Sequence, residues 1–232
     1  MIMPGHCNLG TMCGRYSLHA HPDVIALQFG LASAPDVARR YNIAPGSTVL
    51  VVKEERQPAL VRWGLVPRWA KDAATGAKLS SARAESVAVK PAFRDAYRRR
   101  RCLVPASGFY EWKREGGRKQ PYYVRPQGAE LFGFAALWES WQNLETCSIV
   151  TTEANAVMRP IHDRMPAIVA PEDYARWLSG EDGLLRPAPA ECLRAYPVGP
   201  AVNRAANDSP ALIEPAASAA APLGSTRQLF GD

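Results

Sequence analysis

Apolar residues occur along this chain mostly in short runs bounded by turn-forming residues, a pattern typical of β-strands. The clearest run is Thr48–Val52, an apolar and β-branched segment that follows the turn residues Pro45 and Gly46. Gly116-Gly117 predicts a hairpin turn into a further strand. By the same criteria the remaining strands are expected over 59–65, 102–105, 121–124, 131–138 and 147–152.

Short helices are expected between these strands. Asp23 is the predicted N-cap of a helix that stops at Gly30, and Pro91 opens a second helix through Tyr97. Two more are predicted over 153–158 and 171–178. Strands and helices do not alternate regularly and the chain has no internal repeats. The pattern therefore predicts an α+β fold, a single β-rich domain with an antiparallel, barrel-like sheet core and short peripheral helices.

The two ends of the chain differ from this pattern. Met12 is a second start-capable methionine, so residues 1–12 are interpreted as a leader that is removed or artefactual. We expect the folded domain over 13–215 and a disordered, low-complexity tail over 216–232. No signal peptide is recognisable, and no stretch approaches the ~20 apolar residues of a membrane span. These features predict a cytoplasmic protein.

Charge and cysteine content narrow the function classes. Lys and Arg number 28 against 22 Asp and Glu, and the resulting net charge of +6 favours a polyanionic partner. The densest positive run, Arg94 with 98–101, is either a phosphate-binding surface or a solvated helix face. The 5 cysteines form no C-x-x-C pair and no histidine lies at a zinc-like spacing. Neither a disulfide framework nor a metal site is indicated, and no cofactor is expected.

Met12-Cys13 is the most informative pair for chemistry, because removal of the methionine makes Cys13 the N-terminal residue. An α-amine titrates near ~7.7–8.0 and a thiol near ~8.5, so roughly a tenth of the amine is a neutral nucleophile at pH 7. Such an aminothiol condenses with an aldehyde to a Schiff base, and the sulfur then closes a thiazolidine ring. The alternative is that Cys13 is a buried or incidental cysteine.

Two residues have suitable chemistry to act beside Cys13. Glu111 is flanked by aromatic residues, so its carboxylate is either desolvated or points outward between two buried rings. His162 lies in a charged loop between prolines and is either a catalytic or a structural histidine. Arg83 and Glu85 alternate, which places them on one face of a strand as functional groups or as a surface ion pair.

Arginines and aromatic rings also occur close together in the sequence, as single-stranded nucleic acid requires. Trp63 precedes Gly64 and is either a stacking surface or a core tryptophan beside a glycine bulge. The other members of this group are Arg62, Arg68, Arg83, Arg94, Trp69 and Phe109.

Several motifs then occur together in a fixed order. They are Met-Cys-Gly-Arg-Tyr at 12–16, Tyr-Asn-Ile-Ala-Pro-Gly at 41–46, Arg-Trp-Gly-Leu-Val-Pro at 62–67, Ala-Arg-Ala-Glu at 82–85, Cys-Leu-Val-Pro-Ala-Ser-Gly-Phe-Tyr-Glu-Trp at 102–112, Ile-His-Asp-Arg-Met-Pro at 161–166 and Val-Asn-Arg-Ala-Ala-Asn-Asp at 202–208. Any one is weak, but together they closely resemble the SRAP family, named for SOS-response-associated peptidases and known as abasic-site processing proteins. The resemblance covers about 13–215.

The resemblance implies a monomeric, β-rich domain that binds single-stranded DNA containing abasic sites and shields the lesion by a thiazolidine DNA–protein crosslink. It implies Cys13 as nucleophile, Glu111 as acid and base, and His162 as promoter of Schiff-base chemistry and of AP-lyase-like β-elimination. The DNA-binding residues it implies are Arg15, Asn42, Pro45, Trp63, Trp69, Ser81, Arg83 and Arg164.

One residue departs from the family pattern, which usually has asparagine at the position of Ser81. A hydroxyl is shorter and offers one donor in place of two, so slower crosslinking is expected. The family name also reflects proposed self-processing, which would expose Cys13 by removal of 1–12. Two alternatives remain: a cysteine peptidase or N-terminal-nucleophile amidohydrolase that uses Cys13 with His162, and a non-catalytic single-strand DNA-binding module.

Overall fold

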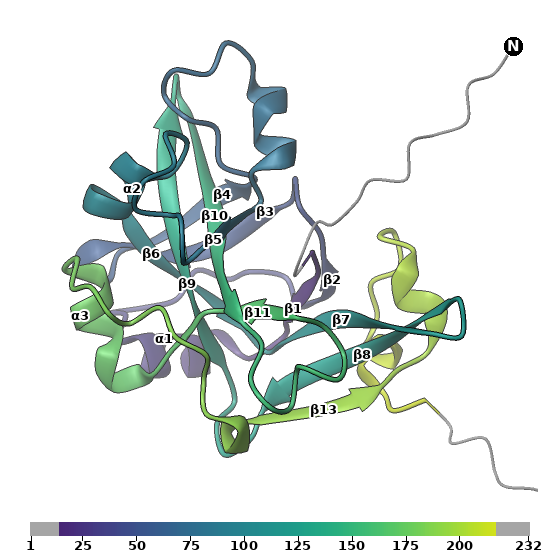
Figure 1. Cartoon of the computed structure of the whole chain (residues 1–232). Helices are drawn as coiled ribbons and strands as arrows, with labels where there is room; N and C mark the ends of the chain where they lie inside the picture. The colour runs from purple at the N-terminus through teal and green to yellow at the C-terminus, as the bar shows by residue number, and fades with distance from the viewer. Residues whose placement is uncertain (1–13, 217–232) are drawn as a thin grey trace, which may run out of the picture.

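The computed structural model describes residues 14–216 (Figure 1). The predicted leader, Cys13 and residues 217–232 of the predicted tail lie outside the described residues. None of the helices within the described range is long and apolar enough to cross a membrane.

Five strands close into a barrel, which confirms the predicted core. They are β3 (Thr48–Val52), β4 (Pro58–Trp63), β6 (Arg101–Ala106), β9 (Phe132–Trp141) and β10 (Leu144–Glu153). The pairings β4–β3, β3–β6, β6–β9 and β9–β10 are antiparallel. The ring closes through a parallel pairing of β10 with β4, a contact between strands far apart in the sequence. The β-branched residues of β3 that predicted a buried strand, Val49, Val51 and Val52, all lie in the core.

The second half of β10 extends beyond the β4 pairing and carries short strands. These are β5 (Ser81–Arg83), parallel to β10, and β11 (Arg164–Pro166), antiparallel to it. A further short strand, β12 (Ile168–Val169), pairs with β9. β10 therefore pairs with β4, β5, β9 and β11, which come from different parts of the chain.

A second sheet of five strands has the order β13-β8-β7-β1-β2. Its strands are β1 (Tyr16–Leu18), β2 (Arg40–Ile43), β7 (Gly108–Glu115), β8 (Arg118–Pro126) and β13 (Leu193–Pro197). The predicted turn at Gly116-Gly117 joins β7 to β8, and this hairpin extends away from the barrel in Figure 1. Phe109 of β7 packs in the barrel-side core, whereas Tyr110 belongs to a smaller cluster on the other face with Val202 and Leu212.

The helices are short and peripheral. They are α1 (Pro22–Phe29), α2 (Arg94–Arg99) and α3 (Tyr174–Leu178), with 3-10 turns η1 (Glu54–Arg56), η2 (Ala73–Lys78), η3 (Pro171–Asp173), η4 (Ala190–Cys192), η5 (Pro200–Asn203) and η6 (Pro210–Ile213). Gly30 ends α1 with φ 63° as predicted, but the N-cap is His21, whose Nδ1 accepts from the Asp23 N–H. Asp23 instead lies in the first turn.

The helix predicted over 153–158 is wrong. Glu153 is the last residue of β10 and pairs with Arg164 of β11. The following Asn155 accepts hydrogen bonds from the backbone N–H groups of Val157 (3.1 Å) and Met158 (3.0 Å) through its side-chain oxygen. An asparagine that bonds its own neighbouring backbone stabilises a turn in place of a helix.

The arginine run divides into two groups. Arg100 donates to Glu139 Oε2 (2.6 Å), and the buried Arg101 donates to Asp182 Oδ1 (2.8 Å) while its guanidinium stacks on the rings of Tyr97 and Trp177. Only the remaining arginines, Arg94, Arg98 and Arg99, are exposed. The structure therefore shows neither a continuous phosphate-binding surface nor a uniform solvated face.

Candidate functional site

The start of the described chain lies against β7. Tyr16 pairs with Phe109, and the Tyr110 N–H donates to the Arg15 carbonyl oxygen at 3.0 Å. The same antiparallel register, extended by two residues beyond the Tyr16–Phe109 pair, would place Gly14 opposite Glu111. Because Cys13 is joined directly to Gly14, the chain approaches Glu111 immediately after the predicted nucleophile.

Glu111 is buried on the barrel-facing side of β7, with only 4% of its surface exposed. Side chains alternate along a strand, so Glu111 shares the face of Phe109 and not that of Tyr110 and Trp112. Of the two environments predicted for Glu111, the structure shows the buried one. Exclusion of water strengthens the hydrogen bonds of such a carboxylate.

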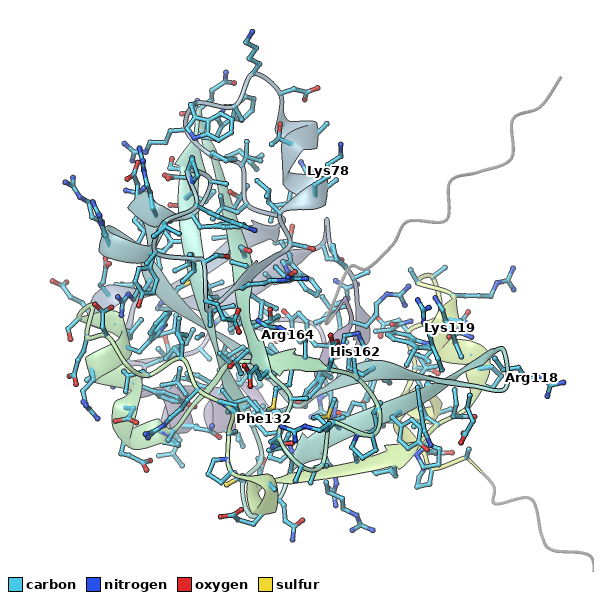
Figure 2. The ribbon with its side chains drawn as sticks, in the orientation of Figure 1. Lys78, Arg118, Lys119, Phe132, His162 and Arg164 are labelled. Carbon is cyan, nitrogen blue, oxygen red and sulfur yellow. The ribbon has the colours of Figure 1, made fainter. Side chains whose placement is uncertain are left out.

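His162 lies on a turn just before β11. Its backbone N–H donates to the Met158 carbonyl oxygen (2.9 Å), and its Nδ1 accepts from the Arg164 N–H (3.0 Å). The Asp163 carboxylate lies 3.1 Å from the same nitrogen. Figure 2 shows His162 and Arg164 in the central part of the molecule, between the barrel and the β7–β8 hairpin. Backbone hydrogen bonds thus fix the His162 N–H and Nδ1, whereas 26% of the side chain remains exposed.

Arg164 is 9% exposed and is engaged within the protein. Its Nη1 and Nη2 donate to the two carboxylate oxygens of Glu85 at 2.6 and 3.0 Å, and Nη2 also donates to the Thr151 carbonyl oxygen at 2.7 Å. The hydrogen bond from Arg164 lowers the pKa of Glu85. Arg164 was predicted from the family pattern as a DNA contact, and in this structure its guanidinium binds Glu85 and Thr151.

β5 presents two of the predicted DNA-binding residues. Ala82 is buried, so its neighbours Ser81 and Arg83 project from the opposite face of the strand, and Arg83 is exposed. Arg83 is therefore accessible to a phosphate. Glu85 follows after the end of β5 and pairs with Arg164, not with Arg83. Sequence reasoning did not predict this ion pair, although Glu85 and Arg164 each lie in one of the family motifs.

Arg15 and Asn42 fasten the C-terminal part of the domain. Asn42 is fully buried, and its Nδ2 lies within hydrogen-bond distance of the carbonyl oxygens of Val202 (3.2 Å), Arg204 (3.1 Å) and Asn207 (2.9 Å). Arg15 Nη1 donates to Asn42 Oδ1 (2.8 Å) and to the Val202 carbonyl oxygen (2.9 Å). Burial lowers the pKa of Arg15. The predicted DNA contact of Asn42 is contradicted, because its side chain has no exposed surface.

Asn42→Ala is therefore expected to lower the free energy of unfolding by about 1–3 kcal/mol, because buried carbonyl oxygens lose their donor. Chemical denaturation measures this loss, and amide hydrogen exchange over 200–208 should increase in parallel. Asn143→Ala, which changes an exposed asparagine, is the control and should leave both unchanged. Equal stability of the two variants would contradict the fastening role.

Trp63 is a core residue, which corrects its prediction as a DNA-stacking surface. It is 1% exposed, its Nε1 donates to the Ser80 carbonyl oxygen (2.8 Å), and its ring meets the Tyr16 ring edge-on at 5.3 Å. Gly64 has φ 129°, and a Cβ there would lie 2.8 Å from the Gly76 carbonyl oxygen, so only glycine fits. Of the two environments predicted for Trp63, the structure shows the core tryptophan, next to a glycine with positive φ.

Trp69 is exposed (64%), and Pro45 is partly exposed. Trp69 does not lie beside the His162 turn. The Ala70 carbonyl oxygen accepts from Trp141 Nε1, and Trp141 pairs with Leu144 at the start of β10, whereas Arg164 pairs with its last residue. At about 3.3 Å per residue, the run of β10 between these two pairs is at most roughly 30 Å long, and the two places lie at its opposite ends. A DNA strand that contacts both Trp69 and the His162 turn must therefore be several nucleotides long.

Two of the three cysteines within residues 14–216 are buried in the core and are poor nucleophiles. Cys102 and Cys147 are free and fully buried, and burial raises the pKa of both thiols well above their usual range. Cys192 is free and exposed. In the same range, no group of three or more His, Cys, Asp or Glu side chains is placed to hold a metal ion.

Comparison with known proteins agrees with the motifs. The family model described as SOS response associated peptidase (SRAP) matches residues 12–205. The abasic site processing protein YoqW of Bacillus subtilis is 38% identical, covering 88% of this chain and 99% of that protein. The abasic site processing protein YedK of Escherichia coli is 31% identical, covering 88% and 100%.

The fold has solved counterparts as well. A crystal structure of a protein from Bacteroides thetaiotaomicron matches with a TM-score of 0.80 and 26% sequence identity, covering 88% of this chain and 100% of that one. Motif order, family match and fold agree over most of the chain, and the chain therefore belongs to the SRAP family of SOS response associated peptidases.

Proposed function

We propose that the mature protein begins at Cys13 and captures abasic sites in single-stranded DNA through a covalent thiazolidine. The α-amine of Cys13 adds to the aldehyde of the ring-opened sugar, and loss of water gives a Schiff base. The sulfur then adds to the imine carbon, and the ring nitrogen keeps a proton supplied by the thiol. The protein does this as a monomer and without a cofactor.

The observation that carries this proposal is the register of β1 on β7, which, if extended by two residues beyond the Tyr16–Phe109 pair, brings the residue after Cys13 opposite the buried Glu111. A carboxylate at this place can take a proton from the amine or thiol and return one to the sugar oxygen. The names of the relatives, abasic site processing proteins, support the same substrate.

Exposed cations lie on both sides of the site. Arg83 is on β5, Lys78 ends η2, and Arg118 and Lys119 lie at the hairpin end (Figure 2). Contacts of such residues with the phosphate backbone make binding tolerant of sequence and sensitive to salt. Selectivity for the lesion then comes from its aldehyde, which an intact nucleotide does not present.

Two further activities belong to the proposal. His162 promotes Schiff-base formation and, as an AP-lyase-like activity, β-elimination at the lesion. Removal of residues 1–12, by methionine aminopeptidase at Met12 or by self-processing, exposes the nucleophile. In the cell we place the protein in the cytoplasm, on the nucleoid when it is bound to DNA.

The test is incubation of mature protein with single-stranded DNA that carries one abasic site, followed by denaturing electrophoresis. The proposal expects a shifted covalent band that depends on the lesion. A cysteine peptidase or amidohydrolase would form an acyl-enzyme on peptides or amides and ignore the lesion, and a non-catalytic binding module would give a shift only on a native gel. Absence of the covalent band would refute the proposal.

Trp69→Ala is expected to weaken binding of long oligonucleotides only. Stacking of a base on an exposed ring contributes about 1–3 kcal/mol, or about 5- to 150-fold in affinity. Because the Trp69 loop and the His162 turn lie at opposite ends of β10, an oligonucleotide with one nucleotide on each side of the lesion should bind both proteins equally. Fluorescence anisotropy with a length series measures this, and equal losses at all lengths would place Trp69 at the lesion itself.

A further inference from the structure

We propose that Glu85 and Arg164 are positioning residues that hold His162 in one tautomer, with the proton on Nε2. This assignment concerns the resting protein, and its consequence for catalysis rests on the proposed function. It gives roles to an ion pair that the proposed chemistry does not use.

The hydrogen bond to His162 Nδ1 determines the tautomer. A neutral imidazole has one N–H donor and one acceptor nitrogen. The Arg164 backbone N–H donates to Nδ1 at 3.0 Å, and an amide cannot exchange its donor role for an acceptor role. Nδ1 is therefore the acceptor, and the proton of the neutral ring lies on Nε2.

Asp163 provides the competing arrangement. Its carboxylate lies 3.1 Å from the same Nδ1 and is 84% exposed. A carboxylate attracts Nδ1 only when that nitrogen carries a proton, and a proton there would face the Arg164 N–H and break its hydrogen bond. Which arrangement holds depends on how firmly the Arg164 backbone is fixed.

Three contacts fix Arg164. Its two terminal nitrogens bind the Glu85 carboxylate as a bidentate pair at 2.6 and 3.0 Å, and Nη2 also binds the Thr151 carbonyl oxygen at 2.7 Å. Its backbone pairs with Glu153 in the β10–β11 ladder. Planar, bidentate guanidinium–carboxylate pairs are geometrically specific. Arg164 thereby links the residues after β5 to β10 and β11, next to the His162 turn.

The remaining guanidinium nitrogen, Nε, is also buried. Nη1 and Nη2 are bound to Glu85 and Thr151 and Nε is buried, so in this assignment the influence of Arg164 on DNA passes through His162. This arrangement leaves neither nitrogen of the neutral ring free to act as a base. His162 instead donates a hydrogen bond from Nε2 to an oxygen of the opened sugar, and the proton acceptor of the site is Glu111. The same tautomer disfavours a Cys13–His162 peptidase pair, which needs an imidazole nitrogen to accept the thiol proton.

The first test is a long-range ¹⁵N–¹H correlation spectrum of the ¹⁵N-labelled full chain, with His162 assigned by comparison with His162→Gln. We expect a single Nε2–H tautomer for His162. An Nδ1–H tautomer, or a mixture, in the wild-type protein would overturn the proposal. This measurement uses no DNA, so its result stands even if no crosslink forms.

The second test uses Glu85→Gln, which keeps the shape but removes the charge of the pair. Positioning predicts mixed tautomers and a covalent step slowed about 10-fold, at unchanged non-covalent affinity for abasic DNA. A direct phosphate contact by Arg164 predicts the opposite, DNA binding tighter than in Glu130→Gln, because the arginine is released from its carboxylate partner. Arg164→Lys keeps the charge but loses the bidentate geometry, and it should resemble Glu85→Gln. Glu130→Gln, at an exposed glutamate, is the matched control. A wild-type tautomer and rate in Glu85→Gln would refute the assignment.

Discussion

Cys13→Ser is expected to abolish the stable crosslink to abasic DNA while leaving binding of intact single strands unchanged. The serine variant keeps its α-amine, so a Schiff base still forms and borohydride should still trap it. The hydroxyl is a far weaker nucleophile than the thiol, and the five-membered ring that makes the link durable does not close. The expected readout is a band that survives denaturing electrophoresis only after reduction.

A protein that retains Met12 supplies the matched control, because it keeps the thiol but converts the α-amine of Cys13 into an amide. It cannot close the thiazolidine ring, so no band should survive denaturing electrophoresis without borohydride. Mass spectrometry of each preparation confirms its N-terminus. A stable crosslink formed by protein with an intact leader would show that the aminothiol is not the reactive group.

Glu111→Gln is expected to slow crosslink formation about 100-fold, within the range of positioned acid–base groups. The amide has the size of the carboxylate but neither accepts nor returns a proton near neutral pH. Because Glu111 is buried, water does not readily replace the missing group. Reversal of the crosslink should slow as well, since the same group serves both directions. Quantified gel bands over time measure both rates.

Glu115→Gln is the control for Glu111→Gln, because Glu115 lies on the same strand but is exposed and pairs only with Lys113 at 3.0 Å among its described contacts. Its crosslinking rate should equal that of the wild-type protein. Native-gel affinity for abasic DNA should be the same in all three proteins. If Glu111→Gln reacted at the wild-type rate, the acid–base role would belong to another group.

The arrangement around His162 also separates the two enzyme classes considered for Cys13. A peptidase dyad needs a histidine that removes the thiol proton, whereas capture of an aldehyde needs a nucleophilic amine and proton transfers at oxygen. The backbone N–H of Arg164 occupies the one acceptor nitrogen of the neutral ring. This geometry agrees better with the aldehyde chemistry.

Local sequence pattern determined most of the elements and the candidate chemistry. The β-branched run of β3, the Gly116-Gly117 turn and Gly30 after α1 are local signals, because backbone preference and side-chain alternation act over a few residues. The helix predicted over 153–158 failed because the Asn155 side chain binds its own backbone and β10 continues to Glu153.

Only the tertiary structure decided which motif residues are exposed and which are buried. Trp63 and Trp69 carry the same ring, yet one lies in the core and the other on the surface. Asn42 and Arg164 have the polar groups that DNA binding needs, but pairing with segments more than 75 residues away in sequence uses those groups inside the protein, as the separations of 160 and 79 residues show. Motifs specify side-chain chemistry, whereas strand register and distant contacts specify its direction, since a shift of one residue turns a side chain to the other face of a sheet.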